Sequence, residues 1–182
     1  MTVAIFGGSF NPPHVAHQLV ALYVLETQAV DALWFVPTYT HPFHKSLVDF
    51  EHRVAMCQLA AGGLGSRVTV SRAEEELAHQ PGFVASRTLD LVEHLIGQGV
   101  APRLVIGSDI LAETPKWYRW PELERRAPPI VIARGGHPGA TGVEMPEISA
   151  TRVRELLATG RDAAGLVPAS VLRYIADHGL YR

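Results

Sequence analysis

Two histidines that lie three residues apart follow a glycine pair near the start of the chain. Gly7-Gly8 comes directly after a short apolar run, and His14 and His17 lie at the start of an apolar-rich stretch. Glycines let a backbone lie close to a phosphate, and a helix N-terminus offers free N–H groups. Residues at i and i+3 share a helix face, so both rings can present N–H groups to one anion. The segment therefore predicts a site that stabilises charge on a transferring phosphoryl group.

This segment differs from the two commonest phosphate-binding patterns. It is not G-x-G-x-x-G, and it lacks the G-K-S/T of the nucleoside triphosphatase loop. An alternative interpretation is that one histidine caps the helix locally while the other packs in the core. Both histidines follow a glycine pair within the first helical turns, and that combination favours the anion site.

A second candidate anion site lies near the other end of the chain, at residues 148–154. Ser149 or Thr151 can cap the helix that follows, and Arg154 can contact phosphate through two N–H groups. A helix N-terminus with hydroxyls and arginine attracts anions by the same argument as the first segment. Taken alone, the pattern fits an ordinary capped surface helix at least as well.

Alternating strands and helices would place these residues at one edge of a sheet. We expect strands at residues 2–6, 32–36, 68–71, 104–106 and 130–133. We expect helices at residues 14–28, 49–61, 83–96, 151–158 and 168–177. Asn11 is the expected N-cap of the first helix, and a tight turn at Gly7-Gly8 is expected to close the first strand. The alternation predicts one doubly wound, Rossmann-like α/β domain over residues 1–182, with a mainly parallel sheet flanked by helices.

In such sheets, ligands bind outside the carboxyl ends of the strands, where the strand order reverses. Four segments that follow predicted strands should therefore meet at one edge: residues 7–17, 37–45, 107–109 and 134–135.

Bulk composition narrows the classes of protein to consider. The chain has 182 residues, 47% of them hydrophobic, and a formal net charge of −2. A basic excess is typical of proteins that bind nucleic-acid backbone, so no nucleic-acid partner is expected. No apolar run is long enough to span a membrane, and the first residues carry no basic leader. With Cys57 as the only cysteine, no internal disulfide can form, and we expect a cytoplasmic protein. The sequence leaves a homo-oligomer open.

Both candidate anion sites resemble signatures of the HIGH-type nucleotidyltransferases. The first is similar to bacterial nicotinate mononucleotide adenylyltransferases, which read Gly-Gly-Ser/Thr-Phe-Asp/Asn-Pro-x-His-x-Gly-His; this chain departs at Ala16. The second is similar to the family's Ile-Ser-Ser-Thr-x-x-Arg, with Ala150 in place of the second serine. The resemblance covers nearly the whole chain in order. It implies transfer of AMP from ATP to nicotinate mononucleotide, giving deamido-NAD and pyrophosphate, with Mg²⁺ carried by ATP.

The resemblance also implies a role for each candidate residue. Catalysis would fall to His14, His17, Lys45 and Arg154. ATP would contact Gly7, Gly8, Ser9, Phe10, Gly107, Asp109, Arg134, Ser149 and Thr151. The mononucleotide would contact Asn11, His44, Thr88 and Trp117, with Trp117 stacked on the pyridine ring. No side chain is expected to hold a metal ion of its own.

Several alternatives remain open at this stage. The acceptor could instead be nicotinamide mononucleotide or phosphopantetheine, because residues 84–87 depart from the family's Tyr-Thr-x-Asp pattern. The chain could be a nucleotide sensor without catalytic activity. A zinc-dependent hydrolase is a further reading, with His14, His17, His41 and His44 as ligands. Against it, Lys45 would repel a cation.

Overall fold

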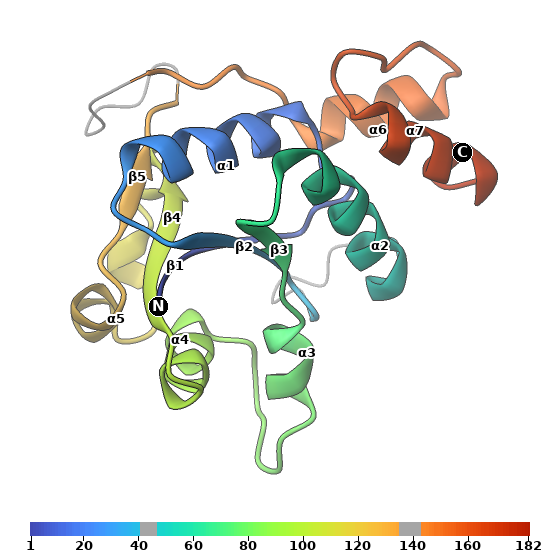
Figure 1. The fold of residues 1–182 in the computed structure, drawn as a ribbon. Coiled ribbons are helices and arrows are strands. Elements are labelled where there is room, and N and C mark those ends of the chain that lie inside the picture. Colours follow the sequence, from blue (N-terminus) through green and yellow to red (C-terminus); the bar gives the residue numbers. More distant parts are fainter. Residues whose placement is uncertain (41–46, 135–142) are drawn as a thin grey trace.

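A five-stranded parallel sheet forms the centre of the computed structural model, which describes residues 1–40, 47–134 and 143–182. The strands are β1 (Thr2–Gly8), β2 (Ala32–Pro37), β3 (Val68–Val70), β4 (Ala101–Gly107) and β5 (Ile130–Ile132). Their order in the sheet is β3-β2-β1-β4-β5, and every pair of neighbours is parallel (Figure 1). The chain runs outward from β1 to β3, then returns to β4 on the other side of β1. The strand order therefore reverses between β1 and β4.

Helices cover both faces of this sheet. They are α1 (Val15–Thr27), α2 (Phe50–Ala61), α3 (Ala73–Ala78), α4 (Thr88–Gly97), α5 (Trp120–Arg126), α6 (Ala150–Ala158) and α7 (Ala169–Asp177). Short 3₁₀ turns are η1 (Gly62–Leu64), η2 (Ser108–Ile110) and η3 (Thr114–Lys116). Figure 1 shows α1 and α2 on one side of the sheet and α3, α4 and α5 on the other. This arrangement confirms the doubly wound α/β class. None of the helices in the described ranges is long and apolar enough to cross a membrane.

Alternating side chains of the strands explain why both faces are covered. Ala4, Leu33 and Phe35 point into the cluster beneath α1 and α2, whereas Val3 and Ile5 point into the cluster beneath α4. Successive residues of a strand face opposite sides, so a continuous apolar strand requires a helix layer on each side.

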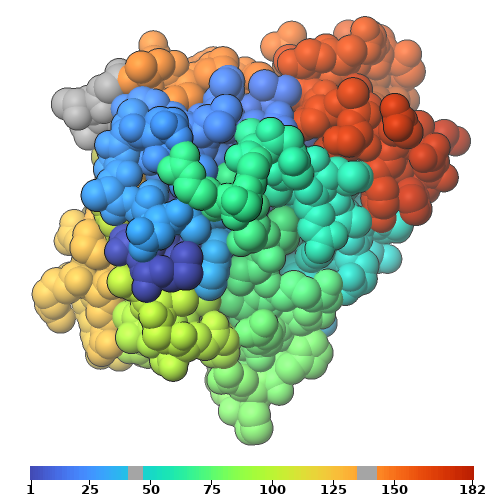
Figure 2. Space-filling model, in the orientation of Figure 1, coloured from blue at the N-terminus to red at the C-terminus, as the bar shows by residue number. Residues whose placement is uncertain are grey.

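Residues 150–182, which we call the C-terminal lobe, pack on α2 and not on the sheet. The shared cluster is fully or nearly fully buried and consists of Met56, Ala60, Val153, Ala163, Val167, Val171 and Ile175. Figure 2 shows the lobe as the dark orange to red atoms gathered at one end of the molecule, beside α2. Because α6 belongs to this lobe, the second candidate anion site depends on how the lobe docks.

The start of the chain differs from the prediction in two details. β1 continues to Gly8, so the glycine pair lies in the strand and not in a tight turn. α1 begins at Val15 with His14 as its N-cap, so the predicted N-cap at Asn11 was wrong. Asn11 is instead bound by other chain segments, as described below.

One predicted helix begins later than expected, and two observed helices were not predicted. The helix expected from residue 83 begins at Thr88, because Val84 is 85% exposed and contributes nothing to a buried face. α3 and α5 were not predicted; both are short, with 6 and 7 residues.

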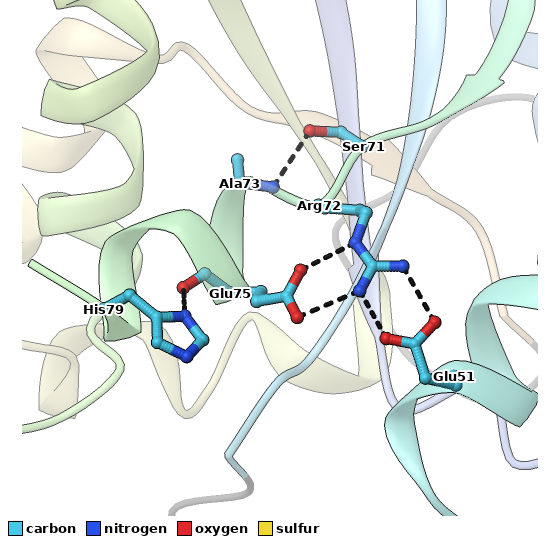
Figure 3. Close-up of polar contacts among 6 residues, drawn as sticks. All are labelled: Glu51, Ser71, Arg72, Ala73, Glu75 and His79. Carbon is cyan, nitrogen blue, oxygen red and sulfur yellow. Dashed lines mark hydrogen bonds and ion pairs between the residues drawn. The ribbon is translucent and has the colours of Figure 1, made fainter.

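Arg72 holds the unpredicted α3 against α2. Its Nε donates to Glu75 Oε2 at 2.6 Å within α3, and its Nη1 donates to Glu51 Oε2 at 3.0 Å on α2 (Figure 3). Ser71 Oγ accepts from the N–H of Ala73 at 3.2 Å, which satisfies one free donor at the helix start. These contacts fix α3 just after β3.

Candidate active site

Three hollows lie along the carboxyl edge of the sheet. The first, which we call the apolar pocket, has a volume of about 370 Å³. Its lining residues are Ile5, Gly7, Gly8, Ser9, Thr38, Glu74, Thr88, Leu91, Leu104, Val105, Ile106, Ile110 and Trp117. Six of them belong to β1 and β4, three to each strand, so the pocket lies where the strand order reverses. This is the position at which a doubly wound sheet binds its ligand.

The apolar pocket brings together an aromatic ring, a helix start and a carboxyl group. Trp117 packs edge-on against Trp120, with 5.7 Å between ring centroids. Thr88 is the first residue of α4, where backbone N–H groups have no helical partner. Glu74 accepts a hydrogen bond from Ser86 Oγ, and burial raises the pKa of the Glu74 carboxyl above its ordinary value. The pocket thus offers a flat apolar ring surface next to a few polar groups, as small-molecule sites do.

The second hollow, the His pocket, also has a volume of about 370 Å³. Its lining residues are Ser9, Phe10, Asn11, His14, His17, Leu47, Ala150, Thr151 and Arg154. The two motifs found at opposite ends of the sequence therefore face one cavity. Ser9 lines this pocket and the apolar pocket alike, so the two hollows adjoin.

The hydrogen bonding of His17 determines which ring nitrogen can donate. His17 Nδ1 accepts from the backbone N–H of His14 at 3.0 Å. A neutral imidazole that accepts at Nδ1 carries its proton on Nε2, so Nε2 is the donor left for a ligand. The local-capping alternative is thus correct for one nitrogen of His17, and the ring keeps its second nitrogen for the pocket.

Both imidazoles are held in the neutral form. Burial, and secondly the charge of Arg134, lower the pKa of His14 from 6.5 to about 4. Burial, followed by His14 and Arg134, holds the pKa of His17 well below its ordinary value. The rings stack with 3.7 Å between centroids, which disfavours two charges at once. At neutral pH the pair is therefore a set of fixed N–H donors without net charge.

The buried ring of Phe10 packs between His17 and Phe35. It is only 3% exposed, and its ring centroid lies 4.9 Å from that of His17 and 5.3 Å from that of Phe35. Its φ of 45° is in the left-handed region, which costs a non-glycine residue on the order of 1 kcal/mol. Packing of the buried ring offsets that cost. The structure therefore shows Phe10 as a platform for His17, and its predicted contact with ATP stays a prediction.

Arg154 is fixed at the wall of the His pocket by two hydrogen bonds. Its Nη1 donates to the carbonyl of Asn11 at 2.8 Å, and its Nη2 donates to Thr151 Oγ1 at 3.3 Å. Ser149 caps α6, as predicted, because its Oγ accepts from the N–H of Arg152 at 3.2 Å. The pocket therefore combines a guanidinium and a helix start with the two imidazoles, and this combination suits a polyphosphate.

The third hollow, the Asp109 pocket, has a volume of about 290 Å³ and is lined by Asp109, Arg134, Met145, Pro146, Glu147, Ile148 and Ser149. Asp109 Oδ2 accepts from Arg134 Nη1 at 3.3 Å. Gly107 makes this possible, because a Cβ there would lie 2.1 Å from Asp109 Oδ1. A Gly-x-Asp pattern thus lets a carboxylate fold back onto the end of β4.

Most predicted site residues come together in these hollows. The His pocket contains Ser9, Phe10, Asn11, His14, His17, Thr151 and Arg154. The Asp109 pocket contains Asp109, Arg134 and Ser149. The apolar pocket contains Gly7, Gly8, Ser9, Thr88 and Trp117. Asn11 was predicted with the mononucleotide residues, yet it lines the same pocket as the histidines. Gly7 and Gly8 were predicted with the ATP residues, yet they line the same pocket as Trp117. His44 and Lys45 lie outside the described residues.

The described residues contain no group of three or more His, Cys, Asp or Glu side chains that could hold a metal ion. The zinc alternative also involves His41 and His44, which lie outside the described ranges. The structure therefore leaves that alternative to experiment.

Two residues near the site were missed by the sequence analysis. Arg53 is only 2% exposed and donates to the carbonyls of Ser9 at 3.1 Å, Thr38 at 2.7 Å and Val48 at 2.9 Å. It thereby ties together the segments that follow β1 and β2. Tyr181 donates from its hydroxyl to Asn11 Oδ1 at 2.7 Å. An arginine inside an apolar helix was the available signal for the first; nothing local marked the second.

Comparisons with known proteins agree with this geometry. A family model described as cytidylyltransferase-like matches residues 5–156. A relative from Anaeromyxobacter sp. (strain K), described as a probable nicotinate-nucleotide adenylyltransferase, is 49% identical over 99% of this chain and 96% of its own length. One from Myxococcus xanthus with the same description is 41% identical over 98% of this chain and 94% of its own.

A solved structure shares the fold. It is the Plasmodium falciparum nicotinic acid mononucleotide adenylyltransferase in complex with NaAD, which superposes with a TM-score of 0.79 at 20% identity, over 99% of this chain and 97% of that one. These relatives, matched over nearly their full length, support the same family as the two sequence signatures and the pockets that the signatures line. This chain belongs to the nicotinate-nucleotide adenylyltransferase family, within the cytidylyltransferase-like proteins.

Proposed function

We propose that this protein transfers AMP from ATP to nicotinate mononucleotide, giving deamido-NAD and pyrophosphate. The observation that carries the proposal is the meeting of His14, His17 and Arg154 in one pocket that adjoins the apolar pocket at Ser9. Relatives of nearly the same length that bear this activity in their names support the choice of substrate.

Each hollow takes one part of the substrates. The triphosphate lies in the His pocket, the adenosine extends toward the Asp109 pocket, and the pyridine ring lies in the apolar pocket against Trp117. This arrangement sets the acceptor's phosphate beside the α-phosphate of ATP, close to Ser9. Positioning of this kind supplies a large part of the catalysis of phosphoryl transfer.

The reaction is a direct in-line displacement. A phosphate oxygen of the mononucleotide attacks the α-phosphorus, a new P–O bond forms, and the bond to the pyrophosphate oxygen breaks. The attacking phosphate is already ionised, so no general base is required. His14 and His17 donate N–H groups to oxygens whose negative charge grows in the transition state, and Arg154 binds the departing phosphates. Because the neutral rings are fixed before ATP arrives, little reorganisation is needed.

We also propose that Mg²⁺ enters with ATP and is not held by a protein site of its own. The measurement is initial rate against Mg²⁺ at fixed total ATP. The rate should follow the concentration of the Mg·ATP complex. A second saturation phase, at Mg²⁺ concentrations beyond those that saturate ATP, would contradict this.

Pyrophosphate release in parallel assays tests the acceptor. We expect the highest kcat/KM with nicotinate mononucleotide, and lower values with nicotinamide mononucleotide and phosphopantetheine. Release with none of the three acceptors would support a nucleotide sensor instead. A stoichiometric metal in the purified protein, together with hydrolysis in the absence of ATP, would support the zinc-dependent hydrolase.

Two substitutions of His17 separate its donor from its local cap. In His17→Asn the amide oxygen can replace Nδ1 as acceptor of the His14 N–H, but no donor remains at the Nε2 position. We expect kcat to fall about 10²- to 10³-fold, because one preorganised donor is lost. His17→Gln can place an amide N–H near the Nε2 position and should retain more activity. Equal activity of the asparagine variant and the wild type would refute the assigned role.

A further inference from the structure

Tyr181, the residue before the C-terminus, reaches back to the first motif of the chain. Its hydroxyl donates to Asn11 Oδ1 at 2.7 Å, across a separation of 170 residues. Asn11 is only 4% exposed, so this hydrogen bond is shielded from water. Burial raises the pKa of the Tyr181 phenol, so the hydroxyl keeps its proton and stays a donor at neutral pH.

Asn11 is the point at which three distant segments meet. Its Oδ1 also accepts from the N–H of Val48 at 3.3 Å, and its carbonyl accepts from Arg154 Nη1 at 2.8 Å. The carbonyl of Val48 in turn accepts from Arg53 Nε at 2.9 Å, so the Val48 backbone is held through both its polar groups. The side chain of Asn11 is thus hydrogen-bonded by Tyr181 and Val48, while its backbone carbonyl holds the guanidinium of Arg154.

We propose that Tyr181 is a positioning residue whose hydroxyl fixes Asn11 and, through the Asn11 carbonyl, sets Arg154 in the His pocket. The inference rests on the proposed function, in which Arg154 binds the triphosphate. Tyr181 itself is not among the residues that line the pocket, so it acts through Asn11. Loss of its hydroxyl leaves the buried Asn11 oxygen with the longer bond from Val48, and the segment that holds Arg154 gains freedom.

A purely structural role makes a different prediction, and Tyr174 provides the matched control. Tyr174 lies on α7, and its hydroxyl lies 2.9 Å from His52 Nδ1 on α2. Tyr174 lines none of the three hollows. Replacing either tyrosine by phenylalanine removes one hydroxyl from the contact between the C-terminal lobe and the rest of the chain. Only Tyr181 is linked to Arg154.

The experiment compares Tyr181→Phe with Tyr174→Phe. For Tyr181→Phe we expect kcat to fall about tenfold, the size of effect produced by loss of one buried hydrogen bond. The KM for nicotinate mononucleotide should stay within about twofold, because neither Tyr181 nor Arg154 lines the apolar pocket. For Tyr174→Phe, kcat should stay within about twofold of the wild-type value. Its Tm should fall by about as much as the Tm of Tyr181→Phe. Equal kcat values in the two variants would overturn the inference.

A double-mutant cycle tests the route of the effect. If Tyr181 acts through Asn11, Tyr181→Phe should lower kcat no further in the Asn11→Ala background. Losses that multiply would show that Tyr181 acts by another route and would reject the proposal.

If the wild-type protein releases no pyrophosphate with any acceptor, the proposed function is wrong. The role of Tyr181 can then still be tested by measuring ATP binding. Tyr181→Phe should then weaken ATP binding in calorimetry several-fold, and Tyr174→Phe should not. Equal ATP affinities for the two variants would reject the inference on its own.

Discussion

Two stacked imidazoles that stay neutral set the chemistry at the scale of single residues. His14 and His17 lie in a pocket with Arg154, so the triphosphate of the proposed function would meet fixed donors and one permanent positive charge there. Neutral donors do not bind water or chloride as tightly as two imidazolium ions would. The pocket can therefore exchange its anionic ligands while still stabilising charge that develops in the transition state.

The lowered pKa values predict how stability depends on pH. The folded pKa of His14 is about 4 and the ordinary value is 6.5, so between these limits the unfolded chain binds a proton that the folded chain does not. The free energy of unfolding should therefore fall as pH drops below about 6.5. His17, whose pKa is also lowered, acts in the same direction. Urea denaturation at pH values from about 7.5 to 5 measures the effect.

The control is the double variant His14→Gln/His17→Asn over the same pH range. Carboxylates such as Glu51 and Glu76, whose pKa values are lowered, contribute mainly at pH values below this range. The double variant should therefore show a flatter dependence above about pH 5 than the wild type. Parallel curves for the two proteins would show that the histidines are not the groups responsible.

Sequence reasoning found the residues proposed to carry the chemistry better than those that hold them in place. His14, His17 and Arg154 belong to short sequence patterns that indicate anion binding at a helix start, and the structure places them in one pocket. The hydrogen bonds of Arg53 to Ser9 and of Tyr181 to Asn11 join residues 44 and 170 positions apart. Only the folded topology brings such partners together, so spacing along the chain could not reveal them.

At the scale of elements, long apolar segments were predicted well and short helices were not. The five strands and the helices α1, α2 and α4 of the sheet layers were found because apolar strands and long apolar-rich helices leave a clear signal. α3 has 6 residues, three of them glutamates, and depends on the Arg72 contacts to α2. α5 begins at Trp120 after a residue with left-handed φ, Arg119. Tertiary contacts and an unusual backbone angle, which single-sequence patterns do not encode, determine these two helices.

Two glycines at the ends of β1 and β4 should affect different substrates when replaced by alanine. In Gly107→Ala the new Cβ would lie 2.1 Å from Asp109 Oδ1, so the carboxylate must move away from the Asp109 pocket. In Gly7→Ala the Cβ meets no atom within 4 Å and projects into the open apolar pocket. We expect Gly107→Ala to raise the KM for ATP and Gly7→Ala to raise the KM for the mononucleotide, each by about tenfold.

Steady-state kinetics with one substrate varied at a time separates the two effects, and each variant is the control for the other. Thermal unfolding should show a larger loss of stability for Gly107→Ala, because only that substitution creates a steric overlap. The assignment of the two hollows to the two substrates would be wrong if both variants raised the same KM.

At the scale of the whole molecule, the fold joins the two ends of the chain at one active site. The start of α1, shortly after β1, supplies the histidines, and the C-terminal lobe supplies Arg154 and Tyr181. Figure 1 shows the lobe beside α2, near the start of α1. The lobe packs on α2 through its own buried cluster, separate from the two clusters that flank the sheet. Completion of the His pocket therefore depends on a packing interface that the sheet itself does not stabilise.

A substitution in that interface should open the lobe before it unfolds the sheet. Val171 is fully buried in the lobe cluster, and Val171→Ala should cost about 1–3 kcal/mol. Hydrogen exchange should then accelerate in α6 and α7 far more than in β1 and β4, because local opening is sufficient to expose the lobe. Val92→Ala, at a fully buried position in the cluster beneath α4, is the matched control. It should not accelerate hydrogen exchange in α6 and α7 more than in β1 and β4.

ATP should reverse the effect of Val171→Ala. In the proposed function ATP contacts residues from both ends of the chain, so it binds the closed arrangement and should slow exchange in α6 and α7 as its concentration rises above Kd. The variant should accordingly keep a near-normal kcat at saturating ATP but show a raised KM for ATP. If instead the amides of β1 and β4 exchanged as fast as those of the lobe, the molecule would unfold as one unit, and closure of the lobe could not be a separate step in forming the site.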